Sequence, residues 1–345
     1  MRLSHIFRGR SLYDTPAMVA LRKTLHGGLI MAKNKVQFQQ GLSLQDFLAQ
    51  FGSEEQCRSQ LHRWRWPKGF SCPECGHDKY CELKCRRLYQ CNRCRHQVSL
   101  TAETIFAYTK LPLTTWFLAI YLVTQSKISV STLSLKRTLG VSYNTSLLLK
   151  HTIQQVMVDR DDSKPLTDYV QLDDSYWGGK KRDGQRGRGA TGKIPFIAAE
   201  SMDIDGNPFQ MRFTQVDSFT KTAVKSRARQ HLHPKSLLIS DKLKCFGVLR
   251  ESGWTHLSIK AGKGPDSVKI PEFKWVNTLI ANVKRSLHGT FHAISEHHFH
   301  RYLAEFCYRF NRRFNLAELI PRFVYVALRT PPMPQRLLKL AESHG

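Results

Sequence analysis

The sequence predicts a multidomain chain of α+β and α/β structure, in which small N-terminal modules precede a larger mixed-sheet domain closed by C-terminal helices. Three observations support this prediction. Two Cys-X-X-Cys pairs lie close together in the first third of the 345-residue chain, which is long enough for two or three domains. Segments of helical periodicity follow them. From Tyr169 onward, short apolar runs bounded by glycine or polar residues indicate strands.

The composition is strongly basic: 53 lysine and arginine residues against 27 acidic ones give a formal net charge of +26. Such a chain repels itself unless a polyanion neutralises it, so nucleic acid is the expected partner. A ribosomal-type protein, or a merely soluble basic one, can have the same composition. The longest apolar run, Trp116–Val123, is too short to cross a membrane. No apolar segment follows the first arginines, so a secretory signal is not expected either.

Residues 1–30 show no clear periodicity, whereas a cleaner pattern begins at Met31. We expect Met31 to be the true start, with an upstream read-through before it; an ordinary disordered basic arm is an equal alternative. Residues 31–66 are predicted to be a helical segment. Its last turns carry Leu61, Trp64 and Trp66, which we expect to pack against the module that follows.

Cys72-Pro-Glu-Cys75 and Cys91-Asn-Arg-Cys94 are separated by 15 residues. This is the spacing of a zinc ribbon, in which two tight turns offer four thiolates to one tetrahedral Zn²⁺. Disulfides are the weaker interpretation of the nine cysteines, because no export signal accompanies them. A ribbon over residues 67–105 is too small to bury much surface, so we expect a structural zinc ion to form its core.

The segment between the two cysteine pairs carries further candidate residues. Cys81 and Cys85 could compete as ligands, but four thiolates already complete a site, and packed or free thiols are the simpler interpretation. The ribbon is also rich in basic side chains that could contact DNA, namely Lys79, Lys84, Arg86, Arg87, Arg93 and Arg95.

Residues 110–158 are predicted to form a helix-turn-helix module. After a helix from Pro112 to Gln125, two helical segments, 131–139 and 142–151, are joined by a turn at Gly140. Ser142 is a suitable N-cap for the second segment. The side chains expected to reach a DNA groove are Tyr143, Asn144, Thr145 and Lys150. An ordinary helical hairpin that packs into the core is the alternative.

Two predicted strands each deliver an aspartate at or near the carboxyl end, namely Asp173 and Asp241. A later stretch opens a helical pattern in which Asn277 and Lys284, two turns apart, share one face. Two strand-borne carboxylates and a helix-borne amide oxygen suit a hard cation such as Mg²⁺. The sequence therefore predicts a metal site that draws on three separate segments.

The members of this predicted site also have simpler interpretations. Asp173 and its neighbour Asp174 should point to opposite faces of their strand, so only one of them is expected to join the site. Asp241 could instead cap a helix starting at Lys242, and Asn277 could be a helix N-cap.

Basic side chains accompany the acidic ones. Lys284 is expected to contact a phosphate; an ordinary solvated lysine is the alternative. The Gly178–Lys193 stretch is predicted to be a mobile phosphate-binding loop, or else a solvated insertion. Its cationic residues are Lys180, Lys181, Arg182, Arg186 and Arg188. The last part, Ser295–Asn315, is predicted to be helical, with an apolar stripe that belongs to the core.

The order Asp173, Asp241, Asn277 resembles that of the ISXO-like insertion-sequence transposases, in the subgroup of these DDE-type enzymes whose third acid position holds asparagine. The likeness is carried by the strings Leu-Asp-Asp-Ser-Tyr-Trp-Gly-Gly, Trp-Val-Asn-Thr-Leu-Ile-Ala-Asn-Val-Lys-Arg and Gly-Thr-Phe-His, and it covers roughly Met31 to Arg329. It implies that residues 165–330 form an RNase H-like domain, to which the predicted order β-β-β-α-β-α-β-α corresponds.

The resemblance also implies the chemistry. It assigns the catalytic role to Asp173 rather than Asp174, with Asp241, Asn277 and Lys284 completing the site and Mg²⁺ or Mn²⁺ as the catalytic ion. Water would cleave one strand at an element end, and the freed 3′-hydroxyl would attack target DNA in line. The partners would be double-stranded DNA, at transposon ends and target, and further copies of the chain, because two ends are joined. The expected location is the bacterial cytoplasm, at the nucleoid.

Two alternatives stay open. The first is an RNase H-like nuclease or Holliday-junction resolvase, and the second is a decayed transposase that only binds DNA. The N-terminal modules favour a transposase over the first alternative. Asp173 and Asp241 are both present, which favours either enzyme over the second.

Overall fold

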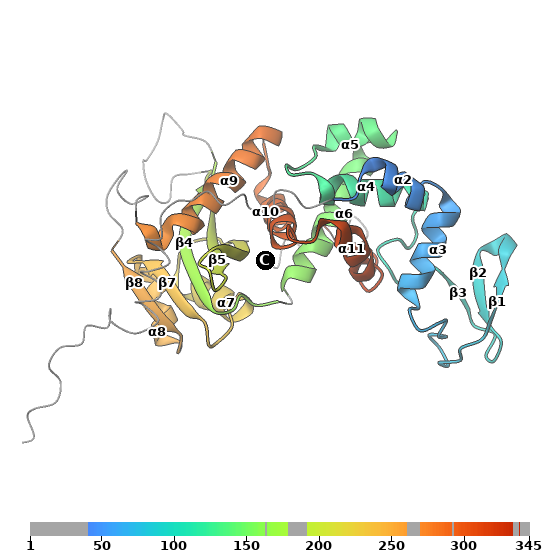
Figure 1. Cartoon of the computed structure of the whole chain (residues 1–345), viewed down its shortest axis with the longest axis horizontal. Helices are drawn as coiled ribbons and strands as arrows, with labels where there is room; N and C mark the ends of the chain where they lie inside the picture. The colour runs from blue at the N-terminus through green and yellow to red at the C-terminus, as the bar shows by residue number, and fades with distance from the viewer. Residues whose placement is uncertain are drawn as a thin grey trace, which may run out of the picture.

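The computed structural model describes residues 41–162, 164–178, 192–260, 270–291, 293–333 and 338. The expectations for residues 1–30, and for the basic loop that carries Lys180, Lys181 and Arg182, lie outside the described residues. Figure 1 shows a helical body between a small strand module and a larger sheet domain. Within the described residues, no helix combines the length and the apolar character needed to cross a membrane.

Two helices, α2 (Leu44–Phe51) and α3 (Glu54–Arg65), open the described chain. Each begins at a serine cap, because the hydroxyls of Ser43 and Ser53 accept backbone N–H groups at 3.1 and 3.2 Å. Gln56 completes a capping box by accepting the backbone N–H of Ser53 at 2.9 Å. The expected helical segment is therefore divided in two.

The small module is an antiparallel sheet of three strands. Its strands are β1 (Tyr80–Leu83), β2 (Leu88–Cys91) and β3 (Gln97–Ser99). Trp66, at the end of α3, packs against it with ring centroids 5.0 Å from Phe70 and 5.3 Å from Tyr89. Leu61 is fully buried beneath the same contact, as the sequence predicts. The module thus shares a core with the helices, in addition to any metal it holds.

Three helices follow, in the arrangement expected for a helix-turn-helix. They are α4 (Leu113–Gln125), α5 (Thr132–Leu139) and α6 (Tyr143–Asp162). Gly140 ends α5 in the left-handed region at φ 66°, where a side chain would be strained. Ser142 caps α6, since its hydroxyl accepts the N–H of Thr145 at 3.1 Å. Helix α6 is longer than the predicted segment 142–151 and runs past residue 158, where the module was predicted to end.

The larger domain is built on a sheet in which five strands run in the order β6-β5-β4-β7-β8 among the described residues. The strands are β4 (Tyr169–Trp177), β5 (Ile194–Met202), β6 (Pro208–Gln215), β7 (Leu237–Asp241) and β8 (Thr255–Ile259). Strand β5 is antiparallel to both β4 and β6, whereas β4, β7 and β8 are mutually parallel. This is the RNase H-like arrangement that the sequence predicts.

Helices cover both faces of this sheet. They are α7 (Lys221–His231), α8 (Gly247–Glu251), α9 (Lys274–Thr290) and α10 (Glu296–Asn311). Helices α7 and α8 cover one face, where Val224 and Leu249 pack on Val170. Helices α9 and α10 cover the other, where Val276 and Phe299 join a separate apolar core. The face under α9 is the one that bears on the candidate active site.

The last described helix, α11 (Leu319–Ala327), returns to the N-terminal helices and packs against α3 and α4. Its Phe323 is buried in the same core as Phe117 of α4. Helix α10 packs against both α6 and β6, so it links the helical body to the sheet domain (Figure 1). The DNA-binding modules predicted from the sequence and the sheet domain are therefore joined by packed helices.

Lys150 is not available to a DNA groove, so that part of the helix-turn-helix prediction is wrong. Its ammonium group is fully buried, donates to the carbonyl of Val130 at 2.6 Å and lies 3.9 Å from Glu305. Burial lowers the pKa of Lys150 to about 8, while Glu305 opposes this effect. Burial acts to raise the pKa of Glu305, but Lys150 and Arg309 hold it below its ordinary value. This charged cluster joins α6 to α10.

Candidate functional site

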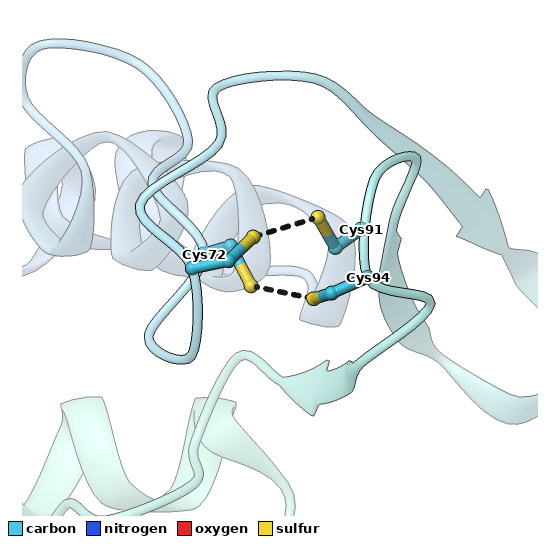
Figure 2. Close-up of side chains that lie close together, drawn as sticks. Cys72, Cys91 and Cys94 are labelled. Atoms are coloured by element: carbon cyan, nitrogen blue, oxygen red, sulfur yellow. Dashed lines mark hydrogen bonds between the residues drawn. The ribbon is translucent and has the colours of Figure 1, made fainter.

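Four sulfur atoms meet in the small module. All four Sγ atoms lie within 4.8 Å of one another. Cys72 Sγ is 3.6 Å from Cys94 Sγ, and Cys75 Sγ is 3.6 Å from Cys91 Sγ. Zn–S bonds of about 2.3 Å place the sulfur atoms of a tetrahedral site about 3.8 Å apart. The four thiols therefore fit one zinc ion, and Figure 2 shows the side chains of Cys72, Cys91 and Cys94 pointing toward one another from two loops.

The two loops that carry these cysteines repeat one geometry. The carbonyl of Cys72 accepts the N–H of Gly76 at 2.9 Å, and that of Cys91 accepts the N–H of Arg95 at 3.1 Å. Gly76 and Arg95 both have positive φ, 71° and 63°. A glycine at the first position signals this turn in the sequence, whereas an arginine at the second does not. The repeated turn aims both cysteines of each pair at one point.

Cys81 and Cys85 do not belong to the sulfur cluster. Both are exposed, on β1 and in the following 3₁₀ turn at Lys84–Arg86. The group of metal-ligating side chains found in this part of the described chain contains only the four other cysteines. The simpler interpretation, that these two thiols are bystanders, agrees with this geometry.

A second cluster lies where β4 and β7 run side by side. One carboxylate oxygen each from Asp173, Asp174 and Asp241 lie within 4.8 Å of one another. The parallel register pairs Leu172 with Ser240, so Asp173 and Asp241 follow this pair on neighbouring strands. Sheet geometry brings them together although they are far apart in the sequence.

Asp174 also lies in this cluster, although consecutive residues of a strand are expected to point to opposite faces. Side chains of consecutive residues do leave a strand on opposite faces, but that rule keeps them apart only within a continuous sheet. The register of β4 with β7 ends at Leu172. Beyond it, β4 stays paired with β5 but no longer pairs with β7, so Asp173 and Asp174 border an unpaired edge beside the end of β7. Sequence alternation does not show where pairing stops.

The carboxylate of Asp241 is held by a backbone N–H group two residues further along the chain. Its Oδ1 accepts the N–H of Leu243 at 3.0 Å. The helical turn that follows begins only at Lys244 and takes no side-chain cap. Asp241 is therefore not a helix cap. Its side chain closes a short turn after β7, and this turn orients the carboxylate at the end of the strand.

Asn277 and Lys284 both lie on α9, against the face of the sheet to which Asp173 belongs. The side-chain oxygen of Gln171, two residues before Asp173, accepts the N–H of Val276 at 3.1 Å. This bond fixes the start of α9 on β4. Phe273 occupies the N-cap position, so Asn277 lies inside the helix and the alternative of a helix cap is wrong. Gln171 is a positioning residue that the sequence does not single out.

Lys284 is electrostatically coupled to the aspartate cluster. Burial lowers the pKa of Lys284, while Asp173 and Asp174 act to raise it. Its ammonium nitrogen lies 5.9 Å from the ring centre of Phe196, on β5. This is a half-buried cation beside carboxylates, so the alternative of a fully solvated lysine does not describe it.

The remaining candidates lie on the helix-turn-helix. Tyr143 and Asn144 are exposed at the start of α6, and Thr145 is half-buried. The hydroxyl of Thr145 lies 2.8 Å from that of Ser142, so it is already hydrogen-bonded within the cap. Tyr143 and Asn144 are therefore the members of this set that present free surface to a ligand.

Comparison with known proteins agrees with this architecture. A profile of the ISXO2-like transposase domain matches residues 165–311, and a profile of the transposase zinc-ribbon domain matches residues 52–97. An uncharacterized protein in the transposable element ISH50 of Halobacterium salinarum is 28% identical over 169 residues. The similar region is 44% of this chain and 56% of the relative, so the chain spans little more than half of that protein's length.

An RNase H-like sheet with aspartates on neighbouring strands, preceded by a zinc ribbon, places the chain among the DDE-type DNA recombination proteins. The two profile matches identify an ISXO2-like transposase domain over residues 165–311 and a transposase zinc ribbon over residues 52–97.

Proposed function

We propose that this chain is the transposase of a bacterial insertion sequence, which cleaves DNA at the ends of its element and joins those ends to target DNA. The observation that carries the proposal is the meeting of Asp173 and Asp241 on neighbouring parallel strands, in a domain matched by the ISXO2-like transposases. The net charge of +26 supports DNA as the substrate.

The catalytic cation is proposed to be Mg²⁺, held by Asp173, Asp241 and Asn277. Two oxygens bound to one Mg²⁺ at about 2.1 Å can be no more than roughly 4.2 Å apart. The carboxylate oxygens of the cluster lie within 4.8 Å of one another, so small side-chain movements suffice to hold the ion. When bound, Mg²⁺ would neutralise charge on the phosphoryl oxygens and favour ionisation of the attacking water or hydroxyl. Asn277 contributes an oxygen without charge, which weakens the hold on the ion.

The other predicted contacts complete the proposal. Lys284 would hold a phosphate beside the carboxylates, and Tyr143 and Asn144 would contact the element ends. The loop residues Lys180, Lys181 and Arg182 remain predictions from the sequence. Because two ends must be joined, we propose that at least two copies of the chain act together.

The test uses the purified chain and duplex oligonucleotides taken from the DNA on both sides of the gene. With Mg²⁺ and a supercoiled target plasmid, we expect nicks that leave 3′-hydroxyl ends, followed by joined products. A duplex of scrambled sequence serves as the control. Cleavage that does not depend on the DNA sequence and yields no joined products would identify a nuclease or resolvase instead. Binding without cleavage would identify a decayed transposase.

Affinity for the flanking duplexes is expected to fall steeply with salt, because basic side chains that contact phosphates release counterions. For six or more phosphate contacts, the affinity should drop about a thousandfold or more between roughly 50 and 200 mM salt. Fluorescence anisotropy titrations over this range measure the slope. An affinity that does not respond to salt would contradict recognition through the phosphate backbone.

Alanine at Asn277 is expected to slow cleavage by about a thousandfold, since the loss of one ligand oxygen costs several kcal/mol of transition-state stabilisation. Asn277→Asp keeps an oxygen at the same place and adds a charge, so it should cleave at a lower Mg²⁺ midpoint. Because Asn277 lies inside α9 rather than at its cap, alanine should leave thermal stability unchanged or slightly raised. Titrating Mg²⁺ in the cleavage assay checks all three proteins. An alanine variant with normal cleavage and an unchanged midpoint would remove Asn277 from the site.

A further inference from the structure

A cleft of about 700 Å³ lies between the sheet domain and the helical body. It is lined by the start of β6, the end of α10 with the segment after it, and α11, while Trp64 of α3 adds one wall. Strand β6 begins opposite the amino end of β4, because Met202 pairs with both Tyr169 and Pro208. The cleft is therefore a separate feature from the aspartates, which lie further along β4.

The lining of this cleft is basic. Among the described residues, no aspartate or glutamate lines it, whereas five cationic side chains do: Arg160, Lys164, Arg212, Arg312 and Arg322. Arg322 also pairs with Glu318 on the surface, but both side chains are about half exposed and such a pair contributes little. Charge of one sign in a concave site favours an anionic occupant.

The cleft is also rich in exposed aromatic rings. Phe209, Phe314 and Tyr325 keep 44%, 40% and 48% of their surface exposed, although each lines the cleft. They come from β6, from the turn after α10 and from α11, and the rings of Phe209 and Phe314 lie 6.1 Å apart. The guanidinium groups of Arg313 and Arg329 lie over one face of the Phe314 and Tyr325 rings, at 4.1 and 3.5 Å, so a base would stack on the other face. Exposed aromatic side chains beside cations are the features with which proteins bind unpaired bases and their phosphates.

We propose that this cleft binds an unpaired stretch of DNA strand, with bases stacked on Phe314 and Tyr325 and phosphates against the surrounding cations. A space of about 700 Å³ holds a few nucleotides at most. A duplex, whose major groove alone is about 12 Å wide, would not fit inside a space of this volume. The inference rests on the proposed function, because a strand nicked at an element end can separate from its complement near the nick and enter the cleft.

The experiment compares two probes, a labelled oligothymidine and a flanking duplex, by equilibrium binding to the full chain. In the double variant Phe314→Ala/Tyr325→Ala, we expect the Kd for oligothymidine to rise at least tenfold, since stacking on both rings is lost. The Kd for the duplex should stay within about twofold. Tyr325→Phe, which keeps the ring, should bind like the wild type. Tyr108→Ala is the matched control, because Tyr108 is 96% exposed and lies outside the cleft.

Lys164→Ser gives a second measurement that does not depend on the aromatic rings. The loss of one phosphate contact should lower the salt slope for oligothymidine by about 0.7, with no change for the duplex. Thermal unfolding of each variant checks that the fold is kept. The inference is overturned if the aromatic double variant binds oligothymidine normally, or if both probes lose affinity equally. Binding of oligothymidine does not require catalysis. If the wild-type chain cleaves no DNA, the proposed function is wrong, whereas the binding result for the cleft still stands.

Discussion

Alanine at Asp173 or at Asp241 is expected to abolish strand cleavage and joining, with rates reduced by about a thousandfold or more. Each residue supplies a carboxylate from a different strand, and the oxygens meet within 4.8 Å. The parallel register places these two aspartates directly after the paired residues Leu172 and Ser240, so each substitution removes one strand's contribution to the site. The measurement is the rate of nicking of a flanking duplex at saturating Mg²⁺.

The fold and the affinity for DNA should survive both substitutions. In the metal-free protein the three clustered carboxylates repel one another, so removing one charge favours the folded state. In each variant this gain is offset by one lost hydrogen bond worth about 1 kcal/mol, from the N–H of Asp174 to Asp173 or from the N–H of Leu243 to Asp241. Thermal unfolding midpoints should therefore change little, and the salt-dependent binding of duplex should remain.

Two further variants give this prediction its controls. Asp205→Ala removes the same charge from the exposed β5–β6 turn and should cleave normally. Asp174→Ala tests whether the third carboxylate of the cluster supports the site; the resemblance to ISXO-like transposases assigns the catalytic role to Asp173 alone. A near wild-type rate for Asp173→Ala, with loss of cleavage in Asp174→Ala, would reverse that assignment.

The sheet and its two central aspartates were predictable because short-range signals specify them. Apolar runs mark β4 and β7 as buried strands, and a charge at the end of such a run is costly unless something satisfies it. The contribution of Asp174 was not predictable, because it depends on the residue at which β4 stops pairing with β7. That point is set by the length of a neighbouring strand distant in the sequence.

Lys150 and Asn277 show two other limits of the sequence. Lys150 sits on a helix where a DNA-facing lysine is reasonable, yet α10 covers it and supplies Glu305 as a partner. Local periodicity does not reveal which distant helix covers which face. Asn277 was a candidate cap from its residue type alone, but the 3₁₀ turn at Pro271–Phe273 starts the helix earlier. A residue's preference for a cap does not fix where the helix begins.

Serine at Cys72 or Cys94 is expected to release the zinc ion and unfold the ribbon. Structural zinc binding in small domains is worth about 10–16 kcal/mol and is folding free energy for the segment that holds the ion. The sulfur atoms come from two loops that the ion would tie together, at 3.6 Å between Cys72 and Cys94. The zinc content measured by elemental analysis should fall from one ion per chain to none. Limited proteolysis should cut the chain between the two loops.

The helical body should stay folded in these variants, which separates loss of the ion from general unfolding. Phe47 and Phe117 keep ring partners outside the ribbon, Tyr121 at 4.6 Å and Trp64 at 6.2 Å between ring centroids, although Trp66 loses its packing against Tyr89. The matched control is Cys81→Ser, an exposed cysteine of the same module outside the sulfur cluster, which should keep its zinc. A metal-free wild-type chain with a protease-resistant ribbon would show that aromatic packing on α3 suffices. The four cysteines would then stabilise the ribbon when metal is bound, without being required for its fold.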